Sequence, residues 1–118
     1  MAPAAALFHS LSDPARLAIL QTLTHGDKRV RDLTEQLGLA QSTVSAHLAC
    51  LKDCGLVDSR PVGRASMFSL TTAREVLEVL AAAEHLLGAT GYRVALCPVY
   101  GLGHQDQPLQ QAIEVSAL

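Results

Sequence analysis

Cysteine has the most distinctive chemistry of any residue type in this chain, and it occurs three times, at Cys50, Cys54 and Cys97. Cys50 and Cys54 are four positions apart, so on a helix they share one face, with Cβ atoms roughly 6 Å apart. Two thiolates at that spacing can close on one large, soft metal ion. Cys97 can complete a three-sulfur site by folding back or by crossing to a second subunit. The three cysteines therefore predict a thiolate metal site.

The number of thiolates indicates which metals the site would take. Three thiolates suit Cd(II) or Pb(II), whereas Zn(II) more often takes four ligands. His104 is a conceivable fourth donor that would admit Zn(II), and His85 is a further candidate ligand. The same thiols also allow a redox switch without any metal, with Lys52 as the nearby side chain that favours a thiolate. The cysteines alone leave this alternative open.

Cys50 and Cys54 fall at the end of a segment with helical periodicity. Val44, Leu48 and Leu51 follow the i, i+4, i+7 spacing of a buried helix stripe, which predicts a helix over residues 41–54. A shorter stripe predicts a helix over residues 30–37, and only three residues separate the two. Two short helices joined by a tight turn that contains glycine form a helix-turn-helix.

The rest of the sequence predicts further helices and two strands around this helix-turn-helix. Asp13 and Pro14 have the residue types that begin a helix, and Gly63 is placed to turn a β-hairpin. We expect further helices at residues 3–11, 14–24 and 72–88, and strands at residues 56–61 and 65–70. The fold class is therefore mainly α with a small β-hairpin, a winged helix-turn-helix.

The first turns of the helix over residues 41–54 carry small and polar side chains between the apolar positions. The N-terminal end of a recognition helix enters the major groove of DNA, where such side chains can pair with base edges or phosphates. An arginine stands at the tip of the hairpin. The residues that we expect to contact double-stranded operator DNA are Gln41, Ser42, Thr43, Ser45, His47 and Arg64.

Length and charge limit the organisation of the chain. Its 118 residues suit one winged helix-turn-helix domain over residues 1–90, followed by a flexible tail over residues 91–118 that carries a metal ligand. The net charge of −2 excludes a strongly basic, non-specific nucleic-acid coat, so DNA binding must come from a local patch. The apolar stripe of the last helix is wider than a lone surface helix needs, which indicates a homodimer through the terminal helices.

Several classes of protein are disfavoured by what the sequence lacks. A signal peptide and an apolar run of membrane-spanning length are both absent, so we expect a cytoplasmic protein with reduced thiols and no membrane partner. Nucleophile–base pairs, phosphate-binding loops and cofactor fingerprints are also absent, so we do not expect an enzyme.

Two of these motifs together resemble the ArsR/SmtB metalloregulators. LSDPARLAIL at residues 11–20 is similar to the opening of that family, and QSTVSAHL at residues 41–48 is similar to its recognition helix. The residues around Gly55 and Gly63 match the approach to the wing and its tip, so the resemblance covers about residues 7–88. It implies a homodimeric repressor that binds operator DNA when metal-free and releases it when metal binds.

The cysteine positions resemble one branch of that family. Residues 28–33 lack the cysteine pair of the arsenic and lead sensors, and His85 stands without the partner ligands of the zinc sensors. The pattern Cys-Leu-x-x-Cys-Gly-Leu-Val at residues 50–57, together with a cysteine in the tail, is similar to the CmtR-type cadmium and lead sensors. This resemblance implies that Cys50, Cys54 and Cys97 are the metal ligands.

Overall fold

The computed structural model describes residues 2–92 and 96, in two compact units that span Met1–Thr72 and Ala73–Leu118. Cys97 and His104 lie outside the described residues, as does most of the predicted tail. The predicted boundary between domain and tail near residue 90 therefore stays a prediction.

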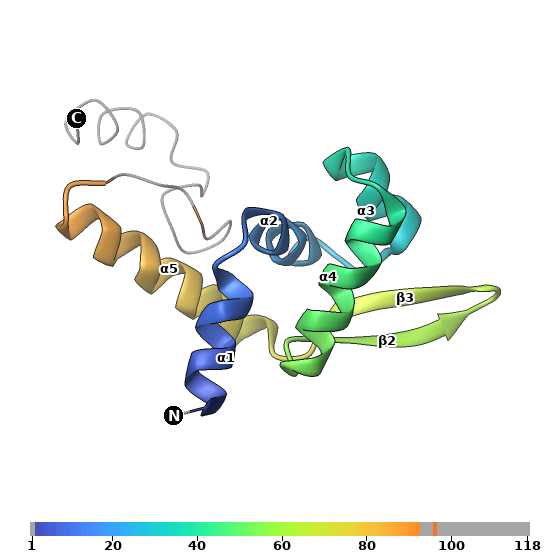
Figure 1. Cartoon of the computed structure of the whole chain (residues 1–118), viewed down its shortest axis with the longest axis horizontal. Coiled ribbons are helices and arrows are strands. Elements are labelled where there is room, and N and C mark those ends of the chain that lie inside the picture. The colour runs from blue at the N-terminus through green and yellow to red at the C-terminus, as the bar shows by residue number, and fades with distance from the viewer. Residues whose placement is uncertain (1, 93–95, 97–118) are drawn as a thin grey trace. The chain divides into compact units, whose positions relative to one another are not determined.

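Among the described residues, the first unit contains four helices and three strands, and the second contains one long helix (Figure 1). Each predicted helix and both strands of the hairpin are present, with ends that agree to about one residue. The elements are α1 (Ala2–Leu11), α2 (Pro14–Leu23), β1 (Lys28–Arg29), α3 (Val30–Leu37), α4 (Gln41–Asp53), β2 (Val57–Val62), β3 (Ala65–Leu70) and α5 (Ala73–Ala89).

Helix α2 begins at the cap that the sequence predicts. The Asp13 carboxylate accepts hydrogen bonds from the backbone N–H groups of Ala15 at 2.7 Å and Arg16 at 3.1 Å. These N–H groups have no partner inside the helix, so the carboxylate satisfies them and fixes where the helix starts. Helix α3 ends at Gly38 in the left-handed conformation, with φ at +68°. That turn leads directly into α4 and sets the helix-turn-helix.

The sheet has three antiparallel strands in the order β1-β3-β2, one more than the sequence predicts. Strand β1 is only two residues long, and Lys28 lies opposite Phe68 of β3. Its short polar sequence has no alternating pattern, so only the pairing with β3 makes it a strand. The β2–β3 turn begins at Gly63 with φ at +62°, as glycine does at the first position of a type II′ turn. Figure 1 shows this hairpin projecting beyond α4.

The core of the first unit joins α4 to its neighbours. Side chains from α2, α3, α4 and β2 are almost fully excluded from solvent, namely Ile19, Leu20, Leu23, Leu33, Val44, Leu48, Leu51 and Val57. The predicted stripe of Val44, Leu48 and Leu51 is thereby confirmed as the buried face of α4. The residues between these positions in the first turns of α4 are left on the outer face.

Helix α5 has both buried and exposed apolar positions. Val76 and Leu80 are buried, whereas Val79 is 40% exposed and Leu86 is 67% exposed. Val79 and Leu86 are seven residues apart, so they lie on one face of the helix. Among the helices described in the structure, none is long and apolar enough to cross a membrane.

Candidate nucleic-acid interface and thiol pair

The outer face of α4 presents hydrogen-bonding side chains in its first turns. Gln41, Ser42, Thr43 and Ser45 are all exposed. They surround the helix N-terminus, where unpaired backbone N–H groups and the helix dipole favour negative charge. The structure therefore brings four of the six predicted DNA-contacting residues together on one exposed helix end.

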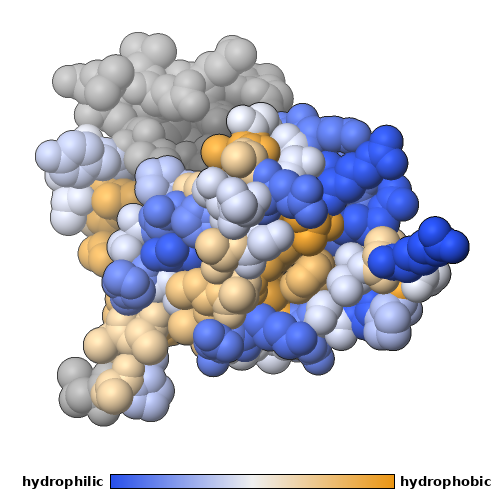
Figure 2. All heavy atoms as spheres, turned by 45° about the vertical axis from the view of Figure 1, so that its right-hand side comes forward, coloured by the Kyte–Doolittle hydropathy of each residue, from blue (hydrophilic) through white to orange (hydrophobic). Residues whose placement is uncertain are grey.

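A groove beside this helix end brings together three arginines from different parts of the chain. Arg29 of β1, Arg31 of α3 and Arg64 of the hairpin turn line it with Gln41, over apolar side chains that include Phe68. We call this surface the arginine groove. Figure 2 shows hydrophilic surface on the side of the molecule where α3 and the hairpin come forward. The groove therefore gathers three guanidinium groups beside exposed polar side chains, two of them paired with carboxylates of α3.

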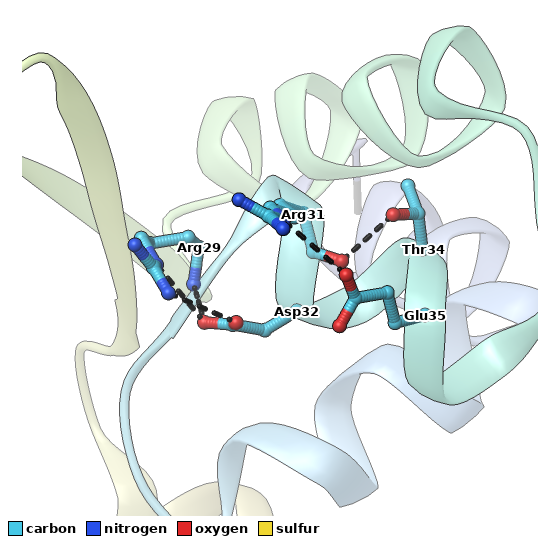
Figure 3. A network of polar contacts seen from close by, with 5 residues as sticks. All are labelled: Arg29, Arg31, Asp32, Thr34 and Glu35. Carbon is cyan, nitrogen blue, oxygen red and sulfur yellow. Dashed lines mark hydrogen bonds and ion pairs between the residues drawn. The ribbon is translucent and has the colours of Figure 1, made fainter.

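Two of these arginines are paired with carboxylates of α3, as Figure 3 shows. Asp32 lies 3.4 Å from the Arg29 guanidinium, and Glu35 lies 3.2 Å from that of Arg31. The backbone N–H of Arg29 donates to Asp32 at 2.9 Å, and this bond is the main reason that the pKa of Asp32 is lowered. Asp32 therefore stays ionised at neutral pH and orients Arg29, while guanidinium N–H groups remain exposed for phosphate.

A separate ion pair links the wing to the body of the unit. Arg60 of β2 donates to the Asp27 carboxylate at 2.8 Å, which connects the hairpin to the loop before β1. Arg64, four residues further on, is exposed at the hairpin turn. The predicted position of Arg64 at the wing tip is therefore confirmed, and its contact with DNA stays a prediction.

His47 is the one predicted DNA-contacting residue that the structure does not place with the others. Its side chain is only 16% exposed, with Nε2 3.8 Å from the Asp13 carboxylate and Nδ1 3.4 Å from Arg16 Nη1. His47 therefore faces the start of α2, away from the exposed end of α4. In this position it can orient the recognition helix, and any contact with a base would require it to leave these partners.

The two cysteines of α4 share one helix face, as their spacing predicts. This face is directed toward helix α1. Cys50 lies inside α4 and Cys54 forms its C-cap, and both are half-buried free thiols. The hydroxyl of Ser10 lies 2.7 Å from Cys54 Sγ and 3.7 Å from Cys50 Sγ. Cys54 Sγ also donates to the backbone carbonyl of Ala6 at 3.8 Å. Both sulfurs thus converge on one buried oxygen of α1.

Ser10 is a residue that sequence reasoning missed. It is fully buried although it belongs to a helix whose other residues are exposed or half-exposed. In the sequence it is separated from the cysteines by 40 and 44 positions, and no local pattern links them. Its burial next to two thiols is decided by the packing of α1 and is not visible in the periodicity of that helix.

The thiol pair fits part of a soft-metal site. Two sulfur donors on one helix face are ligands that Cd(II) or Pb(II) would accept. Across residues 2–92 and 96, however, no group of three or more His, Cys, Asp and Glu side chains is close enough to hold an ion. His85 is exposed on α5, on the same face of the helix as Arg74 and Glu78. A metal site at this pair would therefore need a third ligand from elsewhere.

The predicted third ligand, Cys97, lies outside the described residues, but the residue before it does not. Leu96 donates its backbone N–H to the carboxylate of Glu84 on α5. Glu84 is 1% exposed, which is unusual for a carboxylate. The chain next to Cys97 is thus attached to α5 through a buried acid.

Comparison with known proteins decides the family. The family model described as "Bacterial regulatory protein, arsR family" matches residues 13–59, from the α2 cap to the start of the wing. The transcriptional regulator NmtR of Mycobacterium tuberculosis is 39% identical over 88 residues, which cover 72% of this chain and 73% of NmtR. The chain belongs to the arsR family of bacterial regulatory proteins. The predicted ArsR/SmtB resemblance is thereby confirmed, and it agrees with the expectation that the chain is not an enzyme.

Other members of the arsR family match over shorter stretches. The chain is 39% identical over 70 residues to a probable mercury resistance operon repressor of Streptomyces lividans. It is 42% identical over 66 residues to the transcriptional regulator CmtR of Mycobacterium tuberculosis. In each case it spans 56% of the relative's length.

A solved structure agrees with the predicted fold class. The homodimeric winged helix-turn-helix DNA-binding domain of Mb0332 from Mycobacterium bovis superposes with a TM-score of 0.61 at 31% identity. The match covers 72% of this chain and 82% of that one. The winged helix-turn-helix that the sequence predicts is therefore confirmed.

Proposed function

We propose that this arsR-family chain is a metal-responsive transcriptional repressor. It binds operator DNA in the metal-free form, as a homodimer in the cytoplasm, and releases the DNA when a soft ion such as Cd(II) or Pb(II) binds. The observation that carries this proposal is that the exposed polar turns of α4 and the thiols of Cys50 and Cys54 lie on the same helix. Because a helix moves as one body, a ligand that shifts its C-terminal end also shifts its N-terminal end.

The arginine groove supports the DNA-binding half of the proposal. Arg29, Arg31 and Arg64 supply phosphate contacts next to Gln41, Ser42, Thr43 and Ser45, which supply hydrogen bonds for base edges. A symmetric dimer presents this combination twice, to successive major grooves of one duplex. Because phosphate contacts release counterions, binding should weaken steeply as salt rises.

The thiol pair supports the metal-sensing half. Cys50 and Cys54 would hold the ion together with Cys97, and His104 is a further donor if the ion is Zn(II). A bound soft ion supplies strong thiolate bonds that join segments which are otherwise separate. One relative agrees with this proposal by name, since it is called a probable mercury resistance operon repressor.

Exposed apolar side chains on the terminal helices support a dimer. Phe8 of α1 is 66% exposed and Leu86 of α5 is 67% exposed, with Val79 on the same face of α5 as Leu86. Large apolar side chains on a small domain are costly to leave in water, and a second copy would cover them. The related domain from Mycobacterium bovis is described as homodimeric.

One titration tests the proposal. Cd(II), Pb(II), Zn(II) and As(III) are added to the protein on a fluorescent duplex, selected from a random pool by the metal-free protein. Thiolate-to-metal charge-transfer absorption, which reports metal binding, and the fluorescence anisotropy of the duplex, which reports DNA binding, are followed together. We expect Cd(II) or Pb(II) to produce this absorption and to release DNA at the same molar ratio of metal to protein. Absorption without release, or neither, would contradict the proposal.

A thiol-redox repressor is the second candidate, because Cys50 and Cys54 are free, half-buried thiols on the DNA-reading helix. It predicts that peroxide releases DNA in the presence of a chelator and that a reductant restores binding. The metal-responsive repressor predicts no release under those conditions. The same anisotropy assay therefore separates the two candidates.

A further inference from the structure

Ser10 contacts the thiol pair through its side chain. It is 0% exposed, and the contacts of its hydroxyl are to Cys54 Sγ at 2.7 Å and Cys50 Sγ at 3.7 Å. A buried hydroxyl that loses its hydrogen-bond partner is destabilised, because water cannot replace that partner. The position of α1 is therefore sensitive to what the two sulfurs bind.

The backbone of the same turn connects α1 to α4 at a second point. Arg16 donates from Nε to the carbonyl of Ser10 at 2.7 Å and from Nη2 to the carbonyl of His9 at 3.0 Å. Arg16 Nη1 lies 3.4 Å from Nδ1 of His47 on α4. The last turn of α1 thus contacts the thiol end of α4 through the Ser10 side chain, and the middle of α4 through Arg16 and His47.

The contact between Ser10 and Cys54 is too short to accommodate an ion between the two atoms. A zinc–thiolate bond alone is about 2.3 Å long, and larger soft ions need more room. Ser10 must therefore leave this contact when the thiolate takes a ligand on that side. The hydroxyl is fully buried in the last turn of α1, so the packing around that turn must accommodate its new position.

We propose that Ser10 is a positioning residue that couples the thiol pair to the DNA-reading end of α4. When Cys54 gives up its contact with Ser10, the carbonyls of His9 and Ser10 shift, and the Arg16 guanidinium shifts with them. The Arg16 contact with His47 then changes, and with it the setting of the recognition helix. This inference rests on the proposed metal-responsive function, and it names the residue through which that response reaches the helix.

The test compares Ser10→Ala with wild type and with Ser12→Ala. Ser12 is a matched control, because its exposed hydroxyl bonds the His9 carbonyl in the same turn and contacts no thiol. Cd(II) absorption is measured first, and then the dissociation constant for the selected duplex with and without Cd(II). The ratio of those constants is about 5- to 150-fold for typical allosteric coupling. We expect normal absorption in both variants, a wild-type ratio in Ser12→Ala, and a ratio that falls toward one in Ser10→Ala.

The outcomes distinguish this inference from the proposed function. If Ser10→Ala binds Cd(II) and still releases DNA by the wild-type factor, Ser10 does not couple the two ends, although the proposed function stands. If wild type gives no thiolate-to-metal absorption with Cd(II), the proposed function and the inference about Ser10 both fail.

Hydrogen exchange on wild type decides the question even if Ser10→Ala does not fold. Cd(II) should speed exchange of the α1 amides in peptides that cover residues 2–12, and it should not do so in Cys54→Ser. Exchange in α1 that is unchanged by saturating Cd(II) would overturn the inference.

Discussion

The hydroxyl oxygen of Ser10 lies 2.7 Å from the sulfur of Cys54, although 44 positions separate the two residues in the sequence. This contact places the thiol pair of α4 against helix α1. It gives the cysteines a buried neighbour on another helix. It also means that substitutions at the cysteines can be chosen to keep the contact while removing the metal chemistry.

Cys54→Ser should separate DNA binding from metal response. Serine is close to cysteine in size and can still hydrogen-bond with Ser10, so the fold and the metal-free affinity for DNA should stay near wild type. A thiolate is lost, so Cd(II) absorption should decrease and DNA release should disappear. Cys50→Ser should behave in the same way. Release of DNA by Cd(II) from either variant would place the sensing site elsewhere.

Arg64→Ala should weaken DNA binding and reduce its dependence on salt. Each phosphate contact contributes about 0.9 to the slope of log affinity against log salt. Loss of the exposed Arg64 guanidinium should therefore lower the magnitude of that slope by about 0.9 for each subunit, the contribution of one phosphate contact. Arg74→Ala is the control, because Arg74 is also exposed, at 81%, and does not line the arginine groove. Equal effects of the two substitutions would mean that only net charge matters.

Leu86→Glu should weaken the proposed dimer. Covering a leucine that is 67% exposed contributes up to about 1.5–3 kcal/mol, and a buried glutamate adds a desolvation cost. Sedimentation equilibrium should then show more monomer at the same concentration. Gln36→Glu on α3 introduces the same charge at an exposed polar site and should leave the association constant unchanged. An unchanged association constant for Leu86→Glu would exclude this face of α5 from the dimer.

Asp13 should make the start of α2 sensitive to acid. Hydrogen bonds from the N–H groups of Arg16 and Ala15 lower the pKa of Asp13 below its ordinary 3.8. Its ionised form therefore stabilises the folded chain above pH 3.8, and this contribution is lost as the pH falls through the lowered pKa. Melting temperatures should show this loss in wild type. Asp13→Asn keeps a capping side chain without the titration, so it should lack that part of the pH dependence, and Asp13→Ala should be less stable at neutral pH.

Leu48→Ala should destabilise the first unit strongly. Leu48 is 1% exposed and belongs to the core that joins α4 to α2 and α3. Truncation of a buried leucine typically costs about 2–5 kcal/mol. Urea unfolding should report this loss, whereas Ser45→Ala on the exposed face of α4 should change stability by no more than about 0.5 kcal/mol. A small effect of Leu48→Ala would mean that the core collapses around the cavity.

The sequence by itself determines the elements and their order. The spacing of Val44, Leu48 and Leu51 identifies the buried face of α4, and Asp13 identifies the start of α2. These features follow from interactions within one or two turns of the chain, which depend on residue type and spacing alone. The same local spacing places Cys50 and Cys54 on one helix face. The family resemblance rests on these motifs as well.

Only the tertiary structure decides which elements come together. It makes Lys28 and Arg29 a strand by pairing them with β3, turns His47 toward Asp13 and Arg16, and gathers Arg29, Arg31 and Arg64 into one groove. It also buries Ser10 against the thiols of α4. Each of these relationships joins residues that are far apart in the chain, so they follow from the packing of the whole unit and leave no periodic signal in the sequence.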